Sequence, residues 1–363
     1  MRPLLCGYYG EHNIGDDLLL QALLNQLPVG CQPLVTAHDE AEVRARFGVP
    51  TCQRRSLATV ITALGRCDAL VLGGGSLLQD STSFNSLLYY AALIMAARFR
   101  RLPVLLWGQG LGPLRRRRSR ALVRALLPLV QGISWRDGAS AAMAARWGRS
   151  APVGADPVWS LPPSPWQGEQ GPLVLCWRRT PLLDAAGWRH LLHAVDQLAS
   201  LAGGREVIWL PFHRDQDRGL LAWLQEQTLV PEPLARRSRE VELGDADGCR
   251  TLFAGAGLVL AMRLHGLILA AVAGAPCVAL SYDPKVAAAA GDLGCPLLDL
   301  AAAGPALTHA PAPASLAAGW ADQLGQAPPA GRLAGLQQAT AVHGELLQRW
   351  LSSGAQVASP KAT

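Results

Sequence analysis

Short, continuous apolar runs alternate along this chain with segments whose apolar residues recur at helical spacing. In the first half, the segments 17–27 and 87–98 predict helices, and the apolar runs predict strands. The expected strands lie at residues 2–9, 33–37, 68–72, 103–107, 131–135 and 151–155. Continuous apolar strands separated by helices are typical of a parallel sheet that is covered on both faces, so the fold class is predicted to be α/β.

A stretch rich in proline and glycine, residues 161–172, interrupts the alternation, and we expect a linker between two domains there. The alternation then resumes, with strands expected near 173–177, 206–210, 257–262 and 276–281 and helices near 185–201, 216–227, 246–254 and 266–273. The predicted order is an N-terminal Rossmann-like domain (1–160), the linker, a C-terminal Rossmann-like domain (173–300), an irregular Ala/Pro-rich segment (301–331) and a C-terminal helix (332–352) that packs back on the N-terminal domain.

The composition agrees with two folded domains and indicates the cellular compartment. Half of the 363 residues are hydrophobic and 17% are charged, enough for substantial cores. The eight cysteines are scattered singly, without a C-x-x-C pair, which indicates a reducing, cytoplasmic compartment and neither a zinc site nor a disulfide framework. The first apolar run is too short for a signal peptide. The apolar stretch 252–280 contains Arg263 and His265, so we predict strand–helix–strand there and no membrane span.

Glycine-rich turns follow three of the expected N-terminal strands, at residues 10–17, 73–80 and 108–113. In open α/β sheets ligands bind beyond the carboxyl ends of the strands, and glycine lets the backbone approach a ligand closely. None of the turns is a P-loop or a complete dinucleotide fingerprint. The cleft candidates in these turns are Asn13, Gly15, Asp16, Gly74, Gly75, Ser76, Asp80, Gln109 and Gly110. An alternative for Asp16 is that it caps a helix beginning at Asp17.

In the second half, Arg263 and His265 stand at the end of an expected buried strand. Residues two apart on a strand share a face, so both side chains are predicted to point into one site. Arginine offers a planar fork for a carboxylate or phosphate, and histidine transfers protons near neutral pH. The alternative is a buried arginine paired with an aspartate, beside a histidine that satisfies backbone groups. We favour the functional interpretation because burying both charges is costly.

Other polar residues follow neighbouring expected strands. Arg178 and Arg179 follow the strand at 173–177, and Lys285 follows the strand at 276–281. His213, after the strand at 206–210, is either a ligand contact or a surface loop histidine. Only two of the 33 basic residues are lysines, which draws attention to Lys285.

Four consecutive arginines form a basic cluster, called the arginine cluster below: Arg115, Arg116, Arg117 and Arg118. Such a run is usually a solvated face. Clustered cations also attract anionic lipid headgroups or pyrophosphate, which makes peripheral contact with an anionic membrane the alternative.

Taken in order, these segments resemble the polysaccharide pyruvyltransferase family, and in particular its CsaB-type members. The segments that carry the resemblance are 10–17 with Asn13, Gly15 and Asp16; Gly73-Gly74-Gly75-Ser76; Gly108-Gln109-Gly110-Leu111-Gly112-Pro113; Trp135-Arg136-Asp137; Gly154-Ala155-Asp156-Pro157; and Met262-Arg263-Leu264-His265-Gly266. They span about residues 4–290, and the Gly-Gln-Gly and Arg-Leu-His-Gly elements are the most specific.

The resemblance implies a fold like that of the two-domain GT-B glycosyltransferases, with the active site in the cleft between the domains. It implies phosphoenolpyruvate as co-substrate, no metal and no other cofactor, and a pyruvyl ketal on a sugar as product. For CsaB-type members the acceptor would be a lipid-linked cell-wall intermediate that contains N-acetylmannosamine. The family pattern puts Arg263, His265 and Gly266 at the donor, with Lys285 as a further contact, and the N-terminal domain on the acceptor side. We expect a cytoplasmic protein, peripheral at the inner face of the cell membrane, with no nucleic-acid partner.

The chemistry of this reaction agrees with these residue types. Phosphoenolpyruvate carries a carboxylate and a phosphate, so its site needs fixed cations, for which Arg263, Lys285 and Arg178 or Arg179 are candidates. A sugar hydroxyl must attack while the methylene carbon is protonated, and we assign His265 as the general acid. The base that activates the hydroxyl is unassigned, with Asp16 and Asp80 as candidates. The competing hypotheses are a GT-B glycosyltransferase that uses a nucleotide sugar and a non-catalytic sugar-binding protein.

Overall fold

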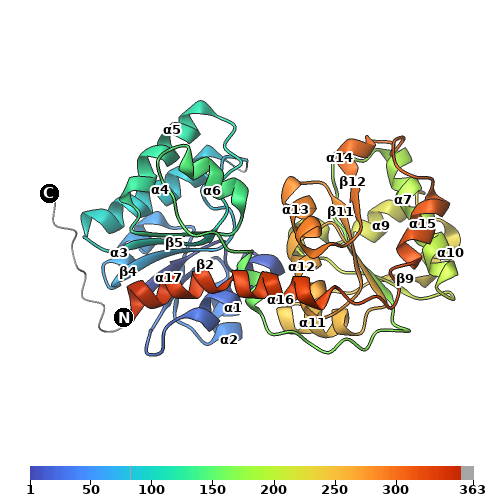
Figure 1. The fold of residues 1–363 in the computed structure, drawn as a ribbon, viewed down its shortest axis with the longest axis horizontal. Coiled ribbons are helices and arrows are strands. Elements are labelled where there is room, and N and C mark those ends of the chain that lie inside the picture. Colours follow the sequence, from blue (N-terminus) through green and yellow to red (C-terminus); the bar gives the residue numbers. More distant parts are fainter. Residues whose placement is uncertain (82, 353–363) are drawn as a thin grey trace. The chain divides into compact units, whose positions relative to one another are not determined.

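A computed structural model describes residues 1–81 and 83–352 and divides the chain into two compact units (Figure 1). Unit 1 comprises Met1–Glu11, Asp16–Ser160 and the described residues from Gln337 to Ser352, whereas unit 2 comprises His12–Gly15 and Leu161–Leu336. Each unit is built on one six-stranded sheet with helices packed on it. The predicted α/β class with two Rossmann-like domains is confirmed.

In unit 1 the six strands run parallel, in the order β3-β2-β1-β4-β5-β6. Their bounds are β1 Pro3–Cys6, β2 Leu34–Ala37, β3 Thr51–Gln53, β4 Ala69–Gly73, β5 Val104–Gln109 and β6 Gly132–Trp135. Every residue of β1, β4 and β5 is buried, which is why these strands appear in the sequence as continuous apolar runs.

The strand expected at 151–155 was wrong. This segment makes only an isolated bridge, between Val153 and Trp135. Pro152 lacks the amide hydrogen that a longer ladder would need at its position.

Helices cover both faces of the unit-1 sheet. They are α1 Ile14–Gln26, α2 Glu40–Phe47, α3 Leu57–Leu64, α4 Phe84–Phe99, α5 Arg117–Leu126, α6 Gly138–Ala145 and α17 Ala341–Leu351. Figure 1 shows α3, α4 and α5 over one face and α1 and α17 over the other. The core on the first face gathers apolar side chains of β1, β4 and β5 with those of α4.

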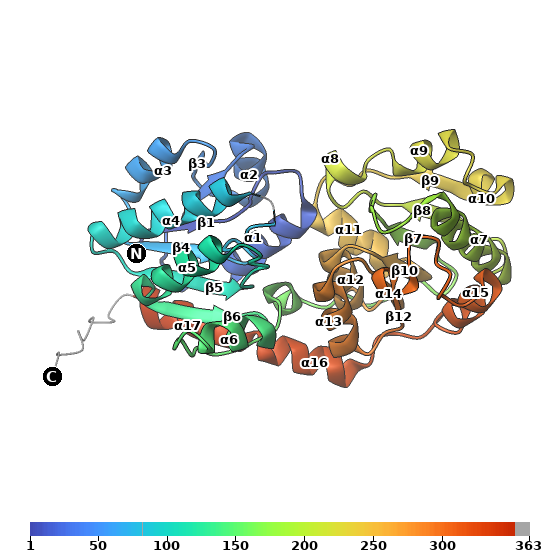
Figure 2. The same cartoon turned by 90° about the horizontal axis from the view of Figure 1, so that it is seen from above.

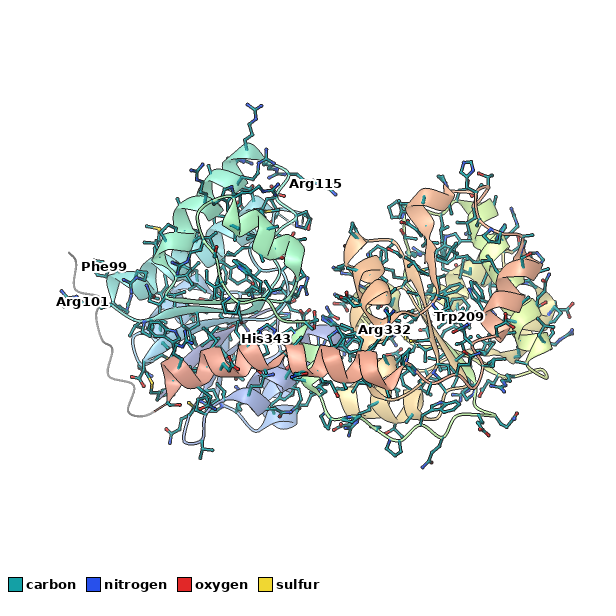
Figure 3. All side chains as sticks on the ribbon, in the orientation of Figure 1. Phe99, Arg101, Arg115, Trp209, Arg332 and His343 are labelled. Carbon is teal, nitrogen blue, oxygen red and sulfur yellow. The ribbon has the colours of Figure 1, made fainter. Side chains whose placement is uncertain are left out.

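The last helix is fixed to the unit-1 sheet by a buried histidine. His343 of α17, labelled in Figure 3, is fully buried. Its ring nitrogens lie 2.8 Å from the Ser134 hydroxyl and 2.8 Å from the Ala155 carbonyl, and its ring packs edge-on against Trp107. Two helices replace the single C-terminal helix that we expected. The first is α16, Ala330–Ala339, and the boundary between the units falls within it.

Unit 2 repeats the parallel arrangement, in the order β12-β11-β10-β7-β8-β9. Its strands are β7 Leu173–Cys176, β8 Val207–Trp209, β9 Ser238–Glu240, β10 Leu258–Ala261, β11 Cys277–Ser281 and β12 Leu297–Asp299. Its helices are α7 Ala185–Leu201, α8 Arg214–Asp217, α9 Leu220–Glu226, α10 Glu232–Arg237, α11 Ala246–Ala254, α12 Leu264–Val272, α13 Pro284–Leu293, α14 Leu300–Ala303 and α15 Pro313–Ala321.

The prediction that residues 301–331 are irregular was wrong where α15 forms. Pro313 begins this helix, a position at which proline costs no hydrogen bond. Leu316, Ala317 and Trp320 are buried on one side of α15, which packs along α7 (Figures 1 and 2). The apolar stretch 252–280 forms the end of α11, then β10, α12 and the start of β11, as predicted. No helix of the described chain combines the length and the apolar character needed to cross a membrane.

Candidate active site

The carboxyl ends of the parallel strands of unit 2 meet at one edge of its sheet, the edge at which such folds bind ligands. The loops that leave β7, β8 and β10 there carry Arg178, His213 and Arg263, and Lys285 lies in the first turn of α13, the helix that follows β11. Strands β8, β7, β10 and β11 are consecutive neighbours in the sheet. Four basic side chains from distant parts of the sequence therefore come from segments that follow adjacent strands.

The structure places Arg263 and His265 at the start of a helix and not on the strand where we expected them. Strand β10 ends at Ala261 and helix α12 begins at Leu264, so Arg263 is the N-cap residue of α12 and His265 lies in its first turn. The expectation that the two side chains share a strand face was therefore wrong. The chain leaves the strand at once because the amides of Met262 and Arg263 both donate to the Cys176 carbonyl, at 3.0 and 3.3 Å.

The Arg263 guanidinium is clamped by a buried carboxylate. Its Nε donates to Oδ2 of Asp217 at 2.9 Å, and its Nη2 donates to Oδ1 of Asp217 and to Gln216. The Asp217 side chain is fully buried and also accepts the backbone amides of Phe212 and His213, at 3.1 and 2.8 Å. The sequence left open that Arg263 is a buried arginine paired with an aspartate, and the structure contains this pair. However, Arg263 Nη1 makes no hydrogen bond to any described residue, so this nitrogen can still donate to a ligand.

A short N-terminal segment, residues 12–15, belongs to unit 2 and lies beside this cluster. Asn13 and His213 form an antiparallel bridge, and the Ile14 amide donates to the Phe212 carbonyl at 3.1 Å. Gly15 lies against His265, so closely that a Cβ on Gly15 would sit 2.3 Å from the imidazole Nδ1. This position needs glycine because the imidazole occupies the space of a side chain.

The start of helix α1 contradicts the alternative that Asp16 caps this helix. Helix α1 begins at Ile14, so Asp16 lies within its first turn and is not the cap. The capping group is Asn13, whose Oδ1 accepts the Gly15 amide at 3.1 Å.

His213, which the sequence left undecided, is buried beside Asp217. Burial and the nearby positive charge of Arg263 lower its pKa, so the imidazole is neutral at neutral pH. Its Nδ1 is buried without a hydrogen-bond partner among the described residues. His213 therefore belongs to the polar cluster and is not a solvated loop residue.

The remaining donor candidates differ in how they are held. Arg178 donates to the Tyr282 hydroxyl at 3.3 Å and lies over that ring, which links the loops after β7 and β11. Arg179 instead stacks 3.9 Å from the centre of the Trp223 ring. The Lys285 ammonium lies 3.5 Å from the Asp283 carboxylate, and its side chain is 45% exposed.

Gly266 packs helix α12 onto strand β7. A Cβ at this position would approach the Cys176 Cβ to 3.1 Å. The backbone N–H groups of the first turn of α12, at Leu264, His265 and Gly266, have no acceptor within the helix. Such groups favour an anion.

At the carboxyl edge of the unit-1 sheet, Gln109 fixes the glycine turn that follows β4. Its side chain is buried and donates to the carbonyls of Leu72 and Gly74, at 3.2 and 2.7 Å. Gly74 and Gly75 both have a φ of +70°, a conformation that glycine adopts without strain. The Gly110 amide donates to the Gly75 carbonyl at 2.7 Å, and this bond joins the turn after β5 to the turn after β4.

A buried arginine joins three of the segments that carry the family resemblance. Arg136 donates to the Ser76 hydroxyl at 2.9 Å and to the Asp156 carboxylate at 3.1 Å. Gly110 must be glycine, since a Cβ there would lie 2.6 Å from Ser76 Oγ and 2.7 Å from Arg136 Nε. The sequence placed Arg136 within a motif but did not show that its partners are Ser76, after β4, and Asp156, beyond α6. Ser76, Gln109 and Gly110 thus form a structural network within unit 1.

Asp80, a candidate base, is already engaged by the backbone. Its carboxylate accepts the amides of Arg115 and Arg116 at 2.9 and 2.8 Å. Burial alone would raise its pKa, but these bonds outweigh burial and hold the pKa below the ordinary value. Asp80 therefore anchors the start of the arginine cluster, whose four side chains are exposed; Arg115 is labelled in Figure 3.

Solved structures with the same architecture include UDP-GlcNAc 2-epimerases and MurG. UDP-GlcNAc 2-epimerase from Neisseria meningitidis, bound to UDP-GlcNAc, is 12% identical with a TM-score of 0.60, over 96% of this chain and 100% of that one. The UDP-GlcNAc 2-epimerase from Methanocaldococcus jannaschii is 11% identical with a TM-score of 0.61, over 94% and 97%. MurG from Acinetobacter baumannii is 14% identical with a TM-score of 0.51, over 96% and 100%. These likenesses show the fold, which is GT-B-like.

Sequence comparison identifies the family. No curated protein matches the chain. A family model described as polysaccharide pyruvyl transferase matches residues 13–284, which is most of the chain. The matched region runs from Asn13 through the glycine turns of unit 1 to the Arg263–His265 cluster of unit 2. The chain therefore belongs to the polysaccharide pyruvyl transferase family.

Proposed function

We propose that the protein transfers the pyruvyl group of phosphoenolpyruvate to two hydroxyls of a sugar, forming a ketal and releasing phosphate. The sugar belongs to a cell-surface polysaccharide or to its lipid-linked precursor, as the CsaB-type resemblance implies. One observation carries the proposal: Arg263 is held by the buried Asp217, keeps Nη1 available for a ligand, and lies two residues before His265.

The donor site that we propose lies at the carboxyl edge of the unit-2 sheet. Phosphoenolpyruvate brings a carboxylate and a phosphate, and Arg263, Arg178 and Lys285 offer cations from the segments that follow three adjacent strands, β10, β7 and β11. The N–H groups in the first turn of α12 add donors for an anion. Arg179 contributes less, because its guanidinium is stacked on Trp223.

The proposed reaction balances without any other reactant. The first sugar hydroxyl adds to C2 of phosphoenolpyruvate while C3 takes a proton from His265, which makes a methyl group. The C2–O bond to phosphate then breaks, and the second hydroxyl adds to C2 and closes the ketal. One hydroxyl proton restores His265 and the other leaves with phosphate. Of the two candidate bases, Asp16 is preferred, because the Asp80 carboxylate already accepts two backbone amides.

Thermal-shift titration of the purified chain tests the donor. Phosphoenolpyruvate should raise the melting temperature, since a ligand at about 100 times its Kd stabilises a protein by about 2.7 kcal/mol. UDP-N-acetylglucosamine should not. The reverse result would favour the nucleotide-sugar glycosyltransferase, and stabilisation only by free sugars would favour a sugar-binding protein.

A matched pair of variants links the shift to the proposed site. Arg178→Gln should weaken the response to phosphoenolpyruvate, because it removes a cation at the carboxyl edge of unit 2. Arg189→Gln changes an exposed arginine of α7 and should leave the response unchanged. Equal responses from both variants would count against this placement of the donor.

A further inference from the structure

A polar cavity lies within unit 1, and none of the residues proposed above for the donor lines it. Its volume is about 320 Å³, which is in the range of small-ligand pockets. It is lined by Tyr8, Arg54, Arg55, Ser83, Ser86 and Tyr89. These residues follow β1 and β3 or lie at the start of α4, so the cavity is at the carboxyl edge of the unit-1 sheet.

The two arginines of this cavity are held in place by one buried carboxylate. Glu11 is 6% exposed and pairs with Arg54 Nη1 and, at 2.6 Å, with Arg55 Nη2. Burial would raise the pKa of Glu11, but hydrogen bonds and charges from Arg55 and Arg54 outweigh it and hold the pKa below the ordinary value. Two guanidinium groups facing one carboxylate leave one positive charge at the cavity.

Aromatic and hydroxyl groups complete the lining. The Arg54 guanidinium lies 4.2 Å from the centre of the Tyr8 ring, and Tyr8 remains 39% exposed. Ser83 caps α4 by accepting the Ser86 amide at 3.0 Å. The positive end of this 16-residue helix therefore faces the same cavity as the arginines.

We infer that this cavity binds the phosphate of a phosphorylated sugar, with the exposed Tyr8 ring as a platform for the sugar. A fixed arginine pair and a helix N-terminus match a phosphate, and an exposed aromatic face matches the apolar face of a pyranose. The identification of this ligand as the acceptor rests on the proposed function. The binding itself does not, because it needs no donor and no turnover.

Calorimetric titration of the full chain tests the inference. N-acetylglucosamine 1-phosphate should bind at least tenfold more tightly than N-acetylglucosamine, because only the former can accept charge-assisted hydrogen bonds. Arg55→Gln should weaken binding of the sugar phosphate by about tenfold or more. The Arg55 side chain is 58% exposed, so this change should leave the fold intact.

Arg44→Gln is the matched control. Arg44 is also an exposed arginine of unit 1, 52% exposed and paired with Glu40, but it does not line this cavity. Its variant should bind the sugar phosphate as the unchanged chain does. Ser86→Asp is a second test that preserves the fold, since a carboxylate at a helix N-terminus is stabilising, yet it should repel phosphate.

Separate outcomes would overturn the inference or identify the source of the phosphate. Unchanged affinity for the sugar phosphate in both Arg55→Gln and Ser86→Asp would overturn it. So would loss of phosphoenolpyruvate affinity alone in these variants, since the cavity would then hold the donor. Competition by UDP-N-acetylglucosamine would indicate a nucleotide-linked sugar, and competition by a polyprenyl diphosphate sugar in detergent would indicate a lipid-linked one. Failure to bind phosphoenolpyruvate anywhere would contradict the proposed function but leave this test intact.

Discussion

Asp217 accepts hydrogen bonds from Arg263 with both carboxylate oxygens, and its Oδ2 also accepts the backbone amides of Phe212 and His213, in the turn that precedes α8. The pair ties the end of helix α8 to the N-cap residue of α12. Removing one partner of a buried ion pair leaves the other without compensation, which costs far more than the pair contributes. Asp217 is therefore a positioning residue for Arg263.

Asp217→Asn should weaken both the fold and donor binding. We expect the free energy of unfolding to fall by about 3–5 kcal/mol, because the Arg263 charge loses its buried partner. The KM for phosphoenolpyruvate should rise while kcat changes less. Denaturant unfolding and steady-state kinetics measure the two effects. Asp215→Asn, an exposed change on the same helix, is the control, and equal effects from both variants would argue against the clamp.

His265→Ala should abolish turnover while phosphoenolpyruvate still binds within a few-fold. A general acid acts mainly in the transition state, and its loss typically costs about 10²–10⁴-fold in rate. Phosphate release measures turnover, and thermal shift measures binding. His309→Ala, an exposed histidine of unit 2, should behave as the unchanged chain does. Near-normal turnover in His265→Ala would remove the acid assignment.

Gly15→Ala should slow catalysis without changing donor affinity greatly. The added methyl would lie 2.3 Å from His265 Nδ1, so the imidazole must move. Displacing a catalytic group by about 1 Å can cost about 10²-fold in kcat. Gly319→Ala adds a methyl in open space on α15 and is the control. If Gly15→Ala keeps the full kcat, the imidazole does not need this exact position.

Strands and helices with strong patterns could be predicted from the sequence, and weakly patterned ones could not. Helices α7 and α11 have the bounds that helical spacing predicted, because their buried faces recur at that spacing. The edge strands β3 and β9 were missed, since the segments Thr-Cys-Gln and Ser-Arg-Glu are polar and contain no fully buried residue. Short edge strands need tertiary pairing to be recognised.

In the candidate site, too, some residues could be predicted from the sequence, whereas their partners in space could not. Arg263 and His265 could be chosen from the sequence because charged residues inside an apolar stretch need a reason. The arginine's partner, Asp217, lies 46 residues away at the end of helix α8, and no periodicity connects the two. The grouping of residues 12–15 with unit 2 was also beyond prediction, because backbone hydrogen bonds to Phe212 and Arg214 create it and leave no side-chain signature.

The arginine cluster should recruit the protein to anionic membranes. Each cation near such a surface contributes about 1 kcal/mol, and salt screens the attraction. Sedimentation with phosphatidylglycerol liposomes should show binding that falls as salt rises, and that is lost when residues 115–118 are all changed to Gln. Changing Arg66, Arg100, Arg101 and Arg146 to Gln removes the same charge from other exposed positions of unit 1 and should have less effect. Equal binding by both variants would leave the cluster as a solvated face.

Lys285→Arg should impair the enzyme. The chain has 31 arginines and only two lysines, so it carries arginine nearly everywhere that a positive charge suffices. Lys285 lies in the first turn of α13, directly after the Asp283–Pro284 step, with its ammonium 3.5 Å from the Asp283 carboxylate. A compact ammonium fits there beside a phosphate or carboxylate, whereas a planar guanidinium demands more room. Steady-state kinetics with varied phosphoenolpyruvate should show a raised KM. Unchanged constants would mean that Lys285, whose side chain is 45% exposed, is an ordinary surface charge.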